Sequence, residues 1–145
     1  MIRGVQLRNR IRFFADRIYS QLGPGFSERV YHNAMEILLR KDSIPYESER
    51  IIPIDFDGHN VGNLRADIIV NKELVVEFKT IKSLTEASEI QARNYLRLTG
   101  LNNALLINYP PGNLQECEIR CVTSIQEPEM PSPLVYKNEV FPRDI

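Results

Sequence analysis

Tryptophan is absent from this chain of 145 residues, and cysteine is scarce, with two copies. Without tryptophan, and without aromatic residues densely interleaved with basic ones, the sequence offers no platform on which nucleic-acid bases would stack. The two cysteines, Cys117 and Cys121, fall in a strand-like segment, where four residues span about 13 Å and a disulfide between them is excluded. A zinc site would need further ligands, and the two histidines are distant in sequence. We therefore expect both cysteines to be small core residues.

A strong net charge and a long apolar run are also missing. The formal net charge is −1, which argues against tight binding to a polyanion through charge alone. No apolar run is long enough to cross a bilayer, and the N-terminus lacks the apolar stretch of a secretory signal. The composition, 43% hydrophobic and 26% charged, is that of a soluble globular domain. We expect an intracellular, cytoplasmic protein with no membrane partner.

Periodicity divides the chain into alternating helical and extended segments. Apolar residues at helical spacing predict a helix over residues 4–22, with a stripe of Leu7, Ile11, Phe14, Ile18 and Leu22. The run Leu22-Gly23-Pro24-Gly25 ends it, and Ser27 caps a second helix that reaches about Lys41. Strands are predicted over residues 46–57, 64–70, 74–80 and 104–109 and around the cysteines, and a third helix over residues 85–98.

Proline marks a change of character near the C-terminus. Prolines 128, 131, 133 and 142 punctuate a segment with little apolar periodicity. We divide the chain into a domain over residues 1–123 and a Pro-rich extension over residues 124–145, which would drape over the body or over a partner. The exposed first helix and this tail are compatible with a homodimer or with a protein partner held through the tail.

Three charged residues stand inside apolar, strand-like runs: Asp67 in Arg-Ala-Asp-Ile-Ile-Val, and Glu77 and Lys79 in Val-Val-Glu-Phe-Lys. Glu77 and Lys79 are two apart and share a strand face. A three-residue turn over residues 71–73 would place Asp67 directly opposite Glu77, whereas a two-residue turn would not. Two opposed carboxylates repel unless a cation joins them, and Mg²⁺ or Mn²⁺ prefers such oxygen ligands. The alternative is a surface hairpin with ordinary salt bridges, which the apolar setting disfavours.

Further motifs are spread along the chain in a fixed order. They are Gly25-Phe26-Ser27-Glu28-Arg29-Val30-Tyr31, Leu64-Arg65-Ala66-Asp67, Val76-Glu77-Phe78-Lys79, Gln91 with Tyr95-Leu96, Leu98-Thr99-Gly100 and Leu105-Leu106-Ile107-Asn108. Over roughly residues 5–122 this pattern resembles the GxxExxY proteins, a branch of the PD-(D/E)XK nuclease superfamily. The resemblance implies an α/β fold with a mixed sheet, namely a restriction-endonuclease-like αβββαβ core, and metal-dependent cleavage of nucleic acid.

The resemblance also implies roles for individual residues. Asp67 and Glu77 match the metal-binding acids, Lys79 the motif lysine, Glu28 the glutamate of the first core helix that often completes the acidic site, and Gln91 a glutamine that orients water or contacts substrate. Taken alone, Glu28 is only a carboxylate well placed against a helix dipole, and Gln91 a buried, satisfied amide. Tyr31 is expected to pack rather than to react, and His32, four residues from Glu28, is the weaker candidate for joining the site.

The leading hypothesis is a nuclease that uses Mg²⁺ or Mn²⁺ held by Asp67, Glu77 and Glu28, with DNA favoured over RNA as substrate. A second hypothesis is a module on the same fold that binds nucleic acid or protein without cutting, and a third is an assembly domain whose acids are structural. Arg3, Arg10 and Arg17 fall seven apart on the first helix. They form a solvated helix face or, as the functional alternative, a weak nucleic-acid contact.

Overall fold

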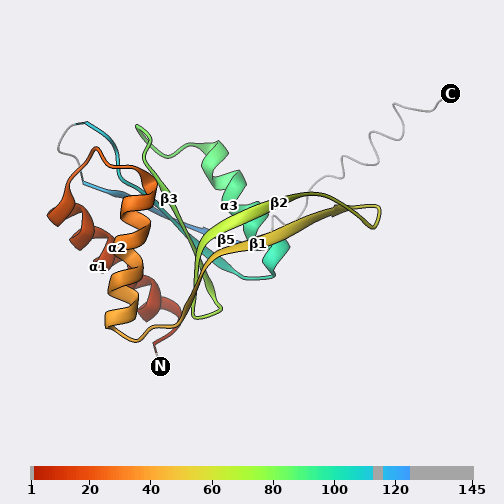
Figure 1. Cartoon of the computed structure of the whole chain (residues 1–145), viewed down its shortest axis with the longest axis horizontal. Coiled ribbons are helices and arrows are strands. Elements are labelled where there is room, and N and C mark those ends of the chain that lie inside the picture. The colour runs from red at the N-terminus through yellow and green to blue at the C-terminus, as the bar shows by residue number, and fades with distance from the viewer. Residues whose placement is uncertain (1, 113–115, 125–145) are drawn as a thin grey trace.

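The computed structural model describes residues 2–112 and 116–124, which form three helices and a five-stranded sheet (Figure 1). The Pro-rich extension predicted from residue 124 onward lies outside the described residues except for Ser124. In chain order the elements are α1 (Gly4–Leu22), α2 (Glu28–Lys41), β1 (Tyr46–Phe56), β2 (His59–Val70), β3 (Leu74–Lys79), α3 (Glu86–Thr99), β4 (Asn103–Asn108) and β5 (Glu118–Thr123).

The strands lie in the order β1-β2-β3-β4-β5, with β3 and β4 parallel and all other neighbours antiparallel. Helix α3 makes the crossover between the two parallel strands, as such a connection requires. The run from α2 to β4 is therefore the predicted αβββαβ core, to which α1 and β5 are added. This mixed α/β architecture confirms the fold class expected from the sequence.

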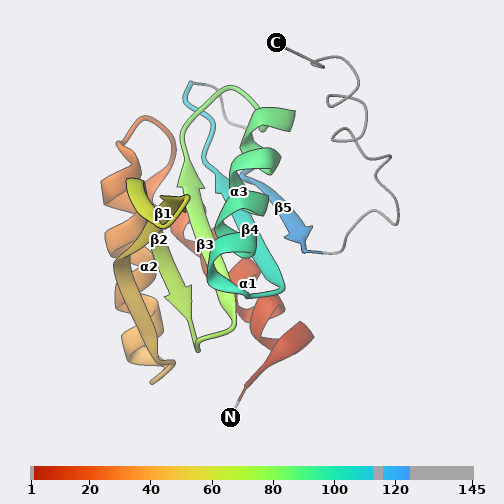
Figure 2. The same ribbon diagram turned by 90° about the vertical axis from the view of Figure 1, so that its right-hand side faces the viewer.

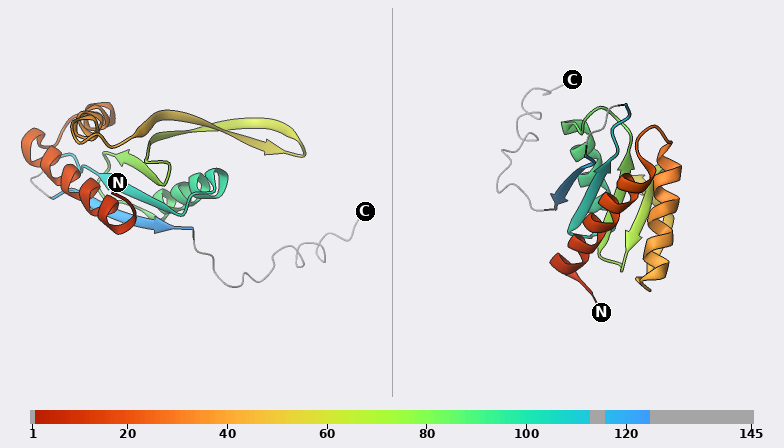
Figure 3. Two further views of the ribbon diagram at one scale, coloured as in Figure 1. Left: turned by 90° about the horizontal axis from the view of Figure 1, so that it is seen from below. Right: turned by 90° about the vertical axis from the view of Figure 1, so that its left-hand side faces the viewer.

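The helices form two layers on opposite faces of the sheet. Figure 2 shows α3 in front of the sheet with α1 and α2 behind it, and the right-hand view of Figure 3 shows α1 and α2 from that other side. Alternate residues of β3 enter different cores: Val76 and Phe78 pack with α1 and α2, whereas Val75 packs with α3. Because side chains alternate along a strand, Glu77 and Lys79 lie on the α3 face with Val75.

Hydrophobic periodicity explains most of α1. Leu7, Ile11, Phe14 and Ile18 are buried as predicted, but Leu22 is 41% exposed. Leu22 is the last residue of the helix, and Gly23 follows with φ 76°, so the chain turns away before Leu22 reaches the core. Ser27 occupies the position before α2 as expected, yet its side chain makes no capping hydrogen bond.

The turn between β2 and β3 confirms the predicted register. Val70 pairs with Leu74, and Asn71 and Lys72 in the three-residue turn adopt positive φ angles of 54° and 57°. The preceding hairpin is longer than predicted, because β2 begins at His59 rather than at Leu64. The extra residues pair with the far end of β1, and Figures 1 and 3 show this hairpin projecting beyond the body of the domain.

The cysteine strand also follows the prediction. Cys117, Ile119 and Cys121 all pack against the core on the α1 side, and both cysteines are free thiols. The strand proper begins one residue after Cys117. Within the described residues, no helix combines the length and the apolar character needed to cross a membrane.

Candidate active site

Asp67 and Glu77 meet where the backbone pairing between β2 and β3 gives way to side-chain contacts. The ladder of paired residues runs from Val70 and Leu74 to Ile68 and Val76. At the next position the Asp67 backbone N–H donates to Glu77 Oε2 at 3.1 Å, and the Phe78 N–H donates to Asp67 Oδ2 at 2.8 Å. Each carboxylate thus accepts a backbone N–H of the opposite strand. These bonds hold the two acids side by side, as the predicted register requires.

The environment of Glu77 disfavours a negative charge. The residue is 5% exposed, and burial raises its pKa well above the usual value, with the neighbouring charge of Asp67 as the next cause. The backbone N–H of Asp67 and the charge of Lys79 act in the opposite direction but more weakly. A carboxyl group that is kept from ionising by burial and by a neighbouring acid is the arrangement that a bound cation would relieve.

The side chain of Lys79 is held by a residue of α3, the helix that covers this face of the sheet. Its Nζ donates to Gln91 Oε1 at 2.7 Å, which joins the end of β3 to the second turn of α3. Thr85 and Ser88 form a capping box that fixes the start of α3 and hence the position of Gln91. Gln91 is exposed, so the alternative of a buried amide is wrong. The structure therefore brings Asp67, Glu77, Lys79 and Gln91 together, as the sequence predicted.

Tyr95, which the sequence analysis named in the motif with Gln91 but gave no role, lies beside this group. Its hydroxyl group donates to the Arg65 carbonyl oxygen at 2.8 Å, two residues before Asp67. Burial raises the pKa of Tyr95, and the charges of Glu77 and Asp67 raise it further, which places the phenol near both acids. The available signal was its spacing: four residues after Gln91, Tyr95 lies on the same face of α3.

A buried amide clamps the loop that joins Lys79 to α3. Asn108, with no exposed surface, accepts from the Ile81 N–H and donates to the Ile81 carbonyl oxygen, both at 2.9 Å. It also donates to Glu118, whose Oε1 accepts the Leu84 N–H at 2.8 Å. The β3–α3 loop is thereby fixed to β4 and β5, which stabilises the relative placement of Lys79 and Gln91.

No hydrogen bond or ion pair of the described residues joins Glu28 to this group. Glu28 is exposed in the first turn of α2, on the other side of the sheet from α3. Its contribution to the acidic site stays a prediction. His32, one turn further along α2, is 3% exposed and bonds to Glu36 at 2.6 Å and to Ser48 at 3.1 Å, as a packed residue does.

Tyr31, the last residue of the Gly25–Tyr31 motif, packs in the core and holds the loop before α2. It is fully buried, its hydroxyl group donates to the Gly23 carbonyl oxygen at 2.7 Å, and its ring stacks on Tyr109 with centroids 4.1 Å apart. The Phe26 N–H points back to the same hydroxyl group at 3.4 Å. Gly25 adopts φ 101°, which a side chain would strain. The packing role predicted for Tyr31 is confirmed.

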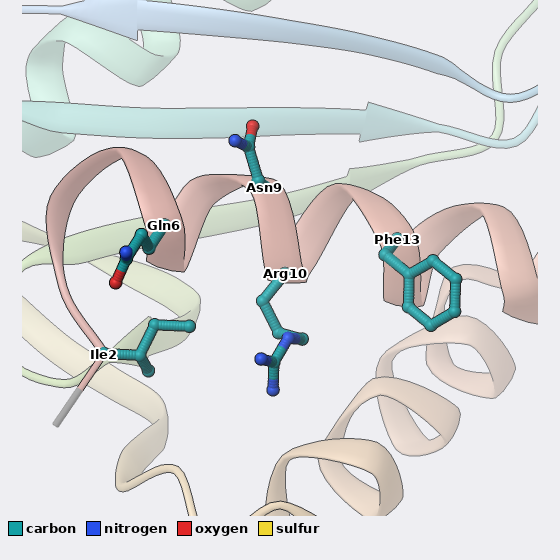
Figure 4. Close-up of a pocket in the computed structure, with 5 residues that line it drawn as sticks. All are labelled: Ile2, Gln6, Asn9, Arg10 and Phe13. Atoms are coloured by element: carbon teal, nitrogen blue, oxygen red, sulfur yellow. The ribbon is translucent and has the colours of Figure 1, made fainter.

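The basic row of α1 occupies the opposite layer from α3. Arg3, Arg10 and Arg17 are exposed, and Arg10 is bound to Asp42 at 2.7 Å. Figure 4 shows Arg10 and Phe13 at a shallow pocket of about 440 Å³, lined also by Ile2, Gln6 and Asn9. This pocket contains none of the predicted metal-binding residues. A nucleic-acid contact by the row stays a prediction.

Comparison with known families now places the chain. A family model described as the PD-(D/E)XK nuclease superfamily matches residues 5–122. The chain belongs to the PD-(D/E)XK nuclease superfamily. A comparison with the curated proteins finds no match.

Two solved structures are similar to this superfamily member. The crystal structure of SSO0001 matches with a TM-score of 0.52 and 22% sequence identity, and the match covers 68% of this chain and 50% of that chain. This chain therefore spans half the length of SSO0001, and the likeness shows the fold alone. An alkaline exonuclease (LHK-Exo) from Laribacter hongkongensis matches with a TM-score of 0.41 and 11% identity, covering 97% of this chain and 77% of that chain.

PD-(D/E)XK nucleases generally use divalent metals, so the fit of these residues to such an ion matters. The described residues contain no group of three or more His, Cys, Asp or Glu side chains placed to hold a metal ion. Asp67 and Glu77 nevertheless each accept a backbone N–H, and their carboxyl groups lie within hydrogen-bond reach of each other, so one cation could contact both. Mg²⁺ commonly binds through one or two carboxylates and keeps several waters. The pair fits such an ion.

Proposed function

We propose that this protein is a metal-dependent nuclease of the GxxExxY branch, and that it hydrolyses phosphodiester bonds of nucleic acid, DNA in preference to RNA. One observation carries the proposal: Asp67 and Glu77 are held side by side by each other's strands, with Lys79 on the same face. The order of motifs from Gly25 to Asn108 supports the branch. The membership of the superfamily supports the general class of reaction.

Asp67 and Glu77 are the residues that would hold the ion, and Glu28 would add a third carboxylate. A bound Mg²⁺ or Mn²⁺ supplies Lewis-acid polarisation of a phosphoryl oxygen and lowers the pKa of a bound water. Lys79 Nζ, oriented by Gln91, is placed to donate to a phosphate oxygen and to stabilise the negative charge that develops there. Burial of Glu77 keeps water away from one side of the site and strengthens these interactions.

The test is a cleavage panel on end-labelled DNA and RNA, with Mg²⁺, with Mn²⁺ and with EDTA. We expect the wild type to cut in the presence of metal only, and Asp67→Ala and Lys79→Ala to lose about 10²-fold or more in rate. Asp55→Ala, which removes an exposed acid on β1, is the matched control and should retain full activity. Equal cleavage by all four proteins would overturn the proposal, because the activity would then come from a contaminant or from another site.

A second measurement tests metal binding independently of cleavage. Mg²⁺ or Mn²⁺ should raise the melting temperature of the wild type but not that of Asp67→Ala, since a ligand that binds only the folded state stabilises it. Metal stabilisation without any cleavage would favour the non-cutting binding module instead.

A further inference from the structure

Two arginines from different elements converge on one carboxylate near the site. Arg29 Nη1 on α2 lies 2.7 Å from Glu49 Oε2, and Arg65 Nη1 on β2 lies 3.3 Å from Glu49 Oε1. Each arginine thus contacts a different oxygen of the same group. Arg29 and Arg65 are 36 positions apart in sequence, so the packing of α2 near β2 is what brings their guanidinium groups together.

The convergence point lies beside Asp67. In the β1–β2 ladder Ser48 pairs with Ile68 and Arg50 with Ala66, so Glu49 falls opposite Asp67. Arg65 is two residues before Asp67 on the same strand, which is about 7 Å along it. A polyanion that places one phosphate at Asp67 would therefore bring a neighbouring phosphate to the two arginines.

Stability does not account for this arrangement. The side chains of Arg29 and Arg65 are 53% and 62% exposed, and pairs this exposed contribute about 0–1 kcal/mol. Glu49 also has a φ angle of 57°, which interrupts the backbone pairing with β2 and costs on the order of 1 kcal/mol for a residue that is not glycine. A strained acid that holds two exposed arginines next to an active-site carboxylate calls for a functional explanation.

We propose that Arg29 and Arg65 form a clamp for a backbone phosphate of the nucleic-acid substrate, next to the phosphodiester that is cut. In the free protein Glu49 is the counter-ion that keeps the two guanidinium groups convergent. A phosphate presents oxygens to two guanidinium groups as this carboxylate does, and it binds in place of Glu49. The pKa of Glu49 is lowered, mainly by the hydrogen bond from Arg29, which agrees with an ionised carboxylate that holds both arginines.

The clamp rests on the proposed function for its substrate, but it is testable without cleavage. Anisotropy titrations of a fluorescein-labelled DNA oligonucleotide in EDTA measure binding in the absence of metal. Arg29→Ala and Arg65→Ala should each raise Kd about five- to tenfold and lower the slope of log Kd against log salt by about 1. Glu49→Gln should lower Kd several-fold, because it removes the competing negative charge while keeping an acceptor for the arginines.

Arg93→Ala is the matched control. Arg93 lies on α3, its side chain is 53% exposed like that of Arg29, and it faces Glu89 at 3.7 Å. This variant removes the same charge from a similar pair and should leave Kd and the salt slope almost unchanged. The clamp would be overturned if Arg29→Ala and Arg65→Ala changed Kd and the salt slope as little as Arg93→Ala does. A Glu49→Gln variant that binds the oligonucleotide more weakly than the wild type would overturn it as well.

The cleavage panel keeps the two proposals apart. If the wild type cuts nucleic acid and Arg29→Ala and Arg65→Ala cut it with the same KM, the clamp is overturned and the proposed nuclease function stands. Arginine-dependent binding in a protein that never cuts would support the clamp and overturn the nuclease.

Discussion

Lys79 Nζ and Gln91 Oε1 lie 2.7 Å apart, so the strand that carries the motif lysine and the helix that follows it share one polar contact. Lys79 is half-buried and Gln91 exposed, and the loop between them is clamped by Asn108. A lysine that is free to rotate would lose its defined direction, because its four-carbon stem is flexible. Gln91 is therefore placed to orient the ammonium group rather than to react.

We expect Gln91→Ala to lower kcat about tenfold or more with little change in KM, since a hydrogen bond to a charged group is worth about 1.5–3 kcal/mol. Gln91→Glu, which keeps an acceptor for Lys79, should recover part of this loss. Steady-state kinetics on the preferred substrate provide the measurement. Arg97→Ala, an exposed change on the same helix, serves as control, and a Gln91→Ala enzyme as fast as this control would refute the orienting role.

Glu77→Gln should stabilise the metal-free protein at neutral and alkaline pH. The pKa of Glu77 is raised in the folded state above its usual value of 4.5, so its contribution to stability is complete below that value and is lost as pH rises through the folded pKa. Glutamine never ionises and still accepts from the Asp67 N–H. The gain in free energy of unfolding should therefore grow as pH rises from the usual pKa of 4.5 toward the raised folded pKa, and reach on the order of 1 kcal/mol or more.

Urea unfolding in EDTA at several pH values measures this gain. Glu47→Gln, which changes an exposed glutamate on β1, should show almost no pH-dependent difference from the wild type. Adding Mg²⁺ should narrow the gap, because the ion stabilises the ionised pair of the wild type. A Glu77→Gln protein that is less stable than the wild type at about pH 8 without metal would show that the site tolerates the charge.

Tyr31 and Glu28 share one motif, and we expect their substitutions to act on different properties. Tyr31→Phe removes the buried hydrogen bond to Gly23 but keeps the ring against Tyr109, so it should cost about 1 kcal/mol and lower the melting temperature by a few degrees. Glu28→Ala changes an exposed side chain and should leave the melting temperature unchanged while it lowers cleavage.

Thermal melts and cleavage rates of the two variants decide between these effects. A Glu28→Ala enzyme with full activity would remove Glu28 from the catalytic site. A Tyr31→Phe protein with an unchanged melting temperature would show that the hydroxyl group does not stabilise the loop before α2.

Local patterns in the sequence predicted the elements and the central register well. The apolar stripe of α1 and the odd-length turn after Val70 are short-range features, and each fixes its own geometry without reference to the rest of the chain. That is why the side-by-side placement of Asp67 and Glu77 follows from the amino-acid sequence by itself. The resemblance to a family placed Lys79 and Gln91 at one site, but their direct contact was not predicted.

Features that depend on the packing of distant elements were not predictable. The positive φ angle of Glu49 carries no sequence signature, because glutamate ordinarily avoids that region. Its two arginines come from α2 and β2, whose separation depends on how the helix packs. The position of Glu28 relative to the acids depends on the same packing. The clamp by Asn108 likewise links a loop to β4 and β5, far away in sequence.

The alternation along β3 has a consequence for how such a protein can change over evolutionary time. Val76 and Phe78 fill one core, whereas Glu77 and Lys79 serve the opposite face. Selection for a folded chain acts chiefly on the first pair, and selection for the proposed activity would act on the second, although all four residues are neighbours in sequence. Loss of the proposed chemistry and loss of the fold would therefore be separate mutational events in this strand, and a descendant without activity could keep the scaffold and acquire a different task.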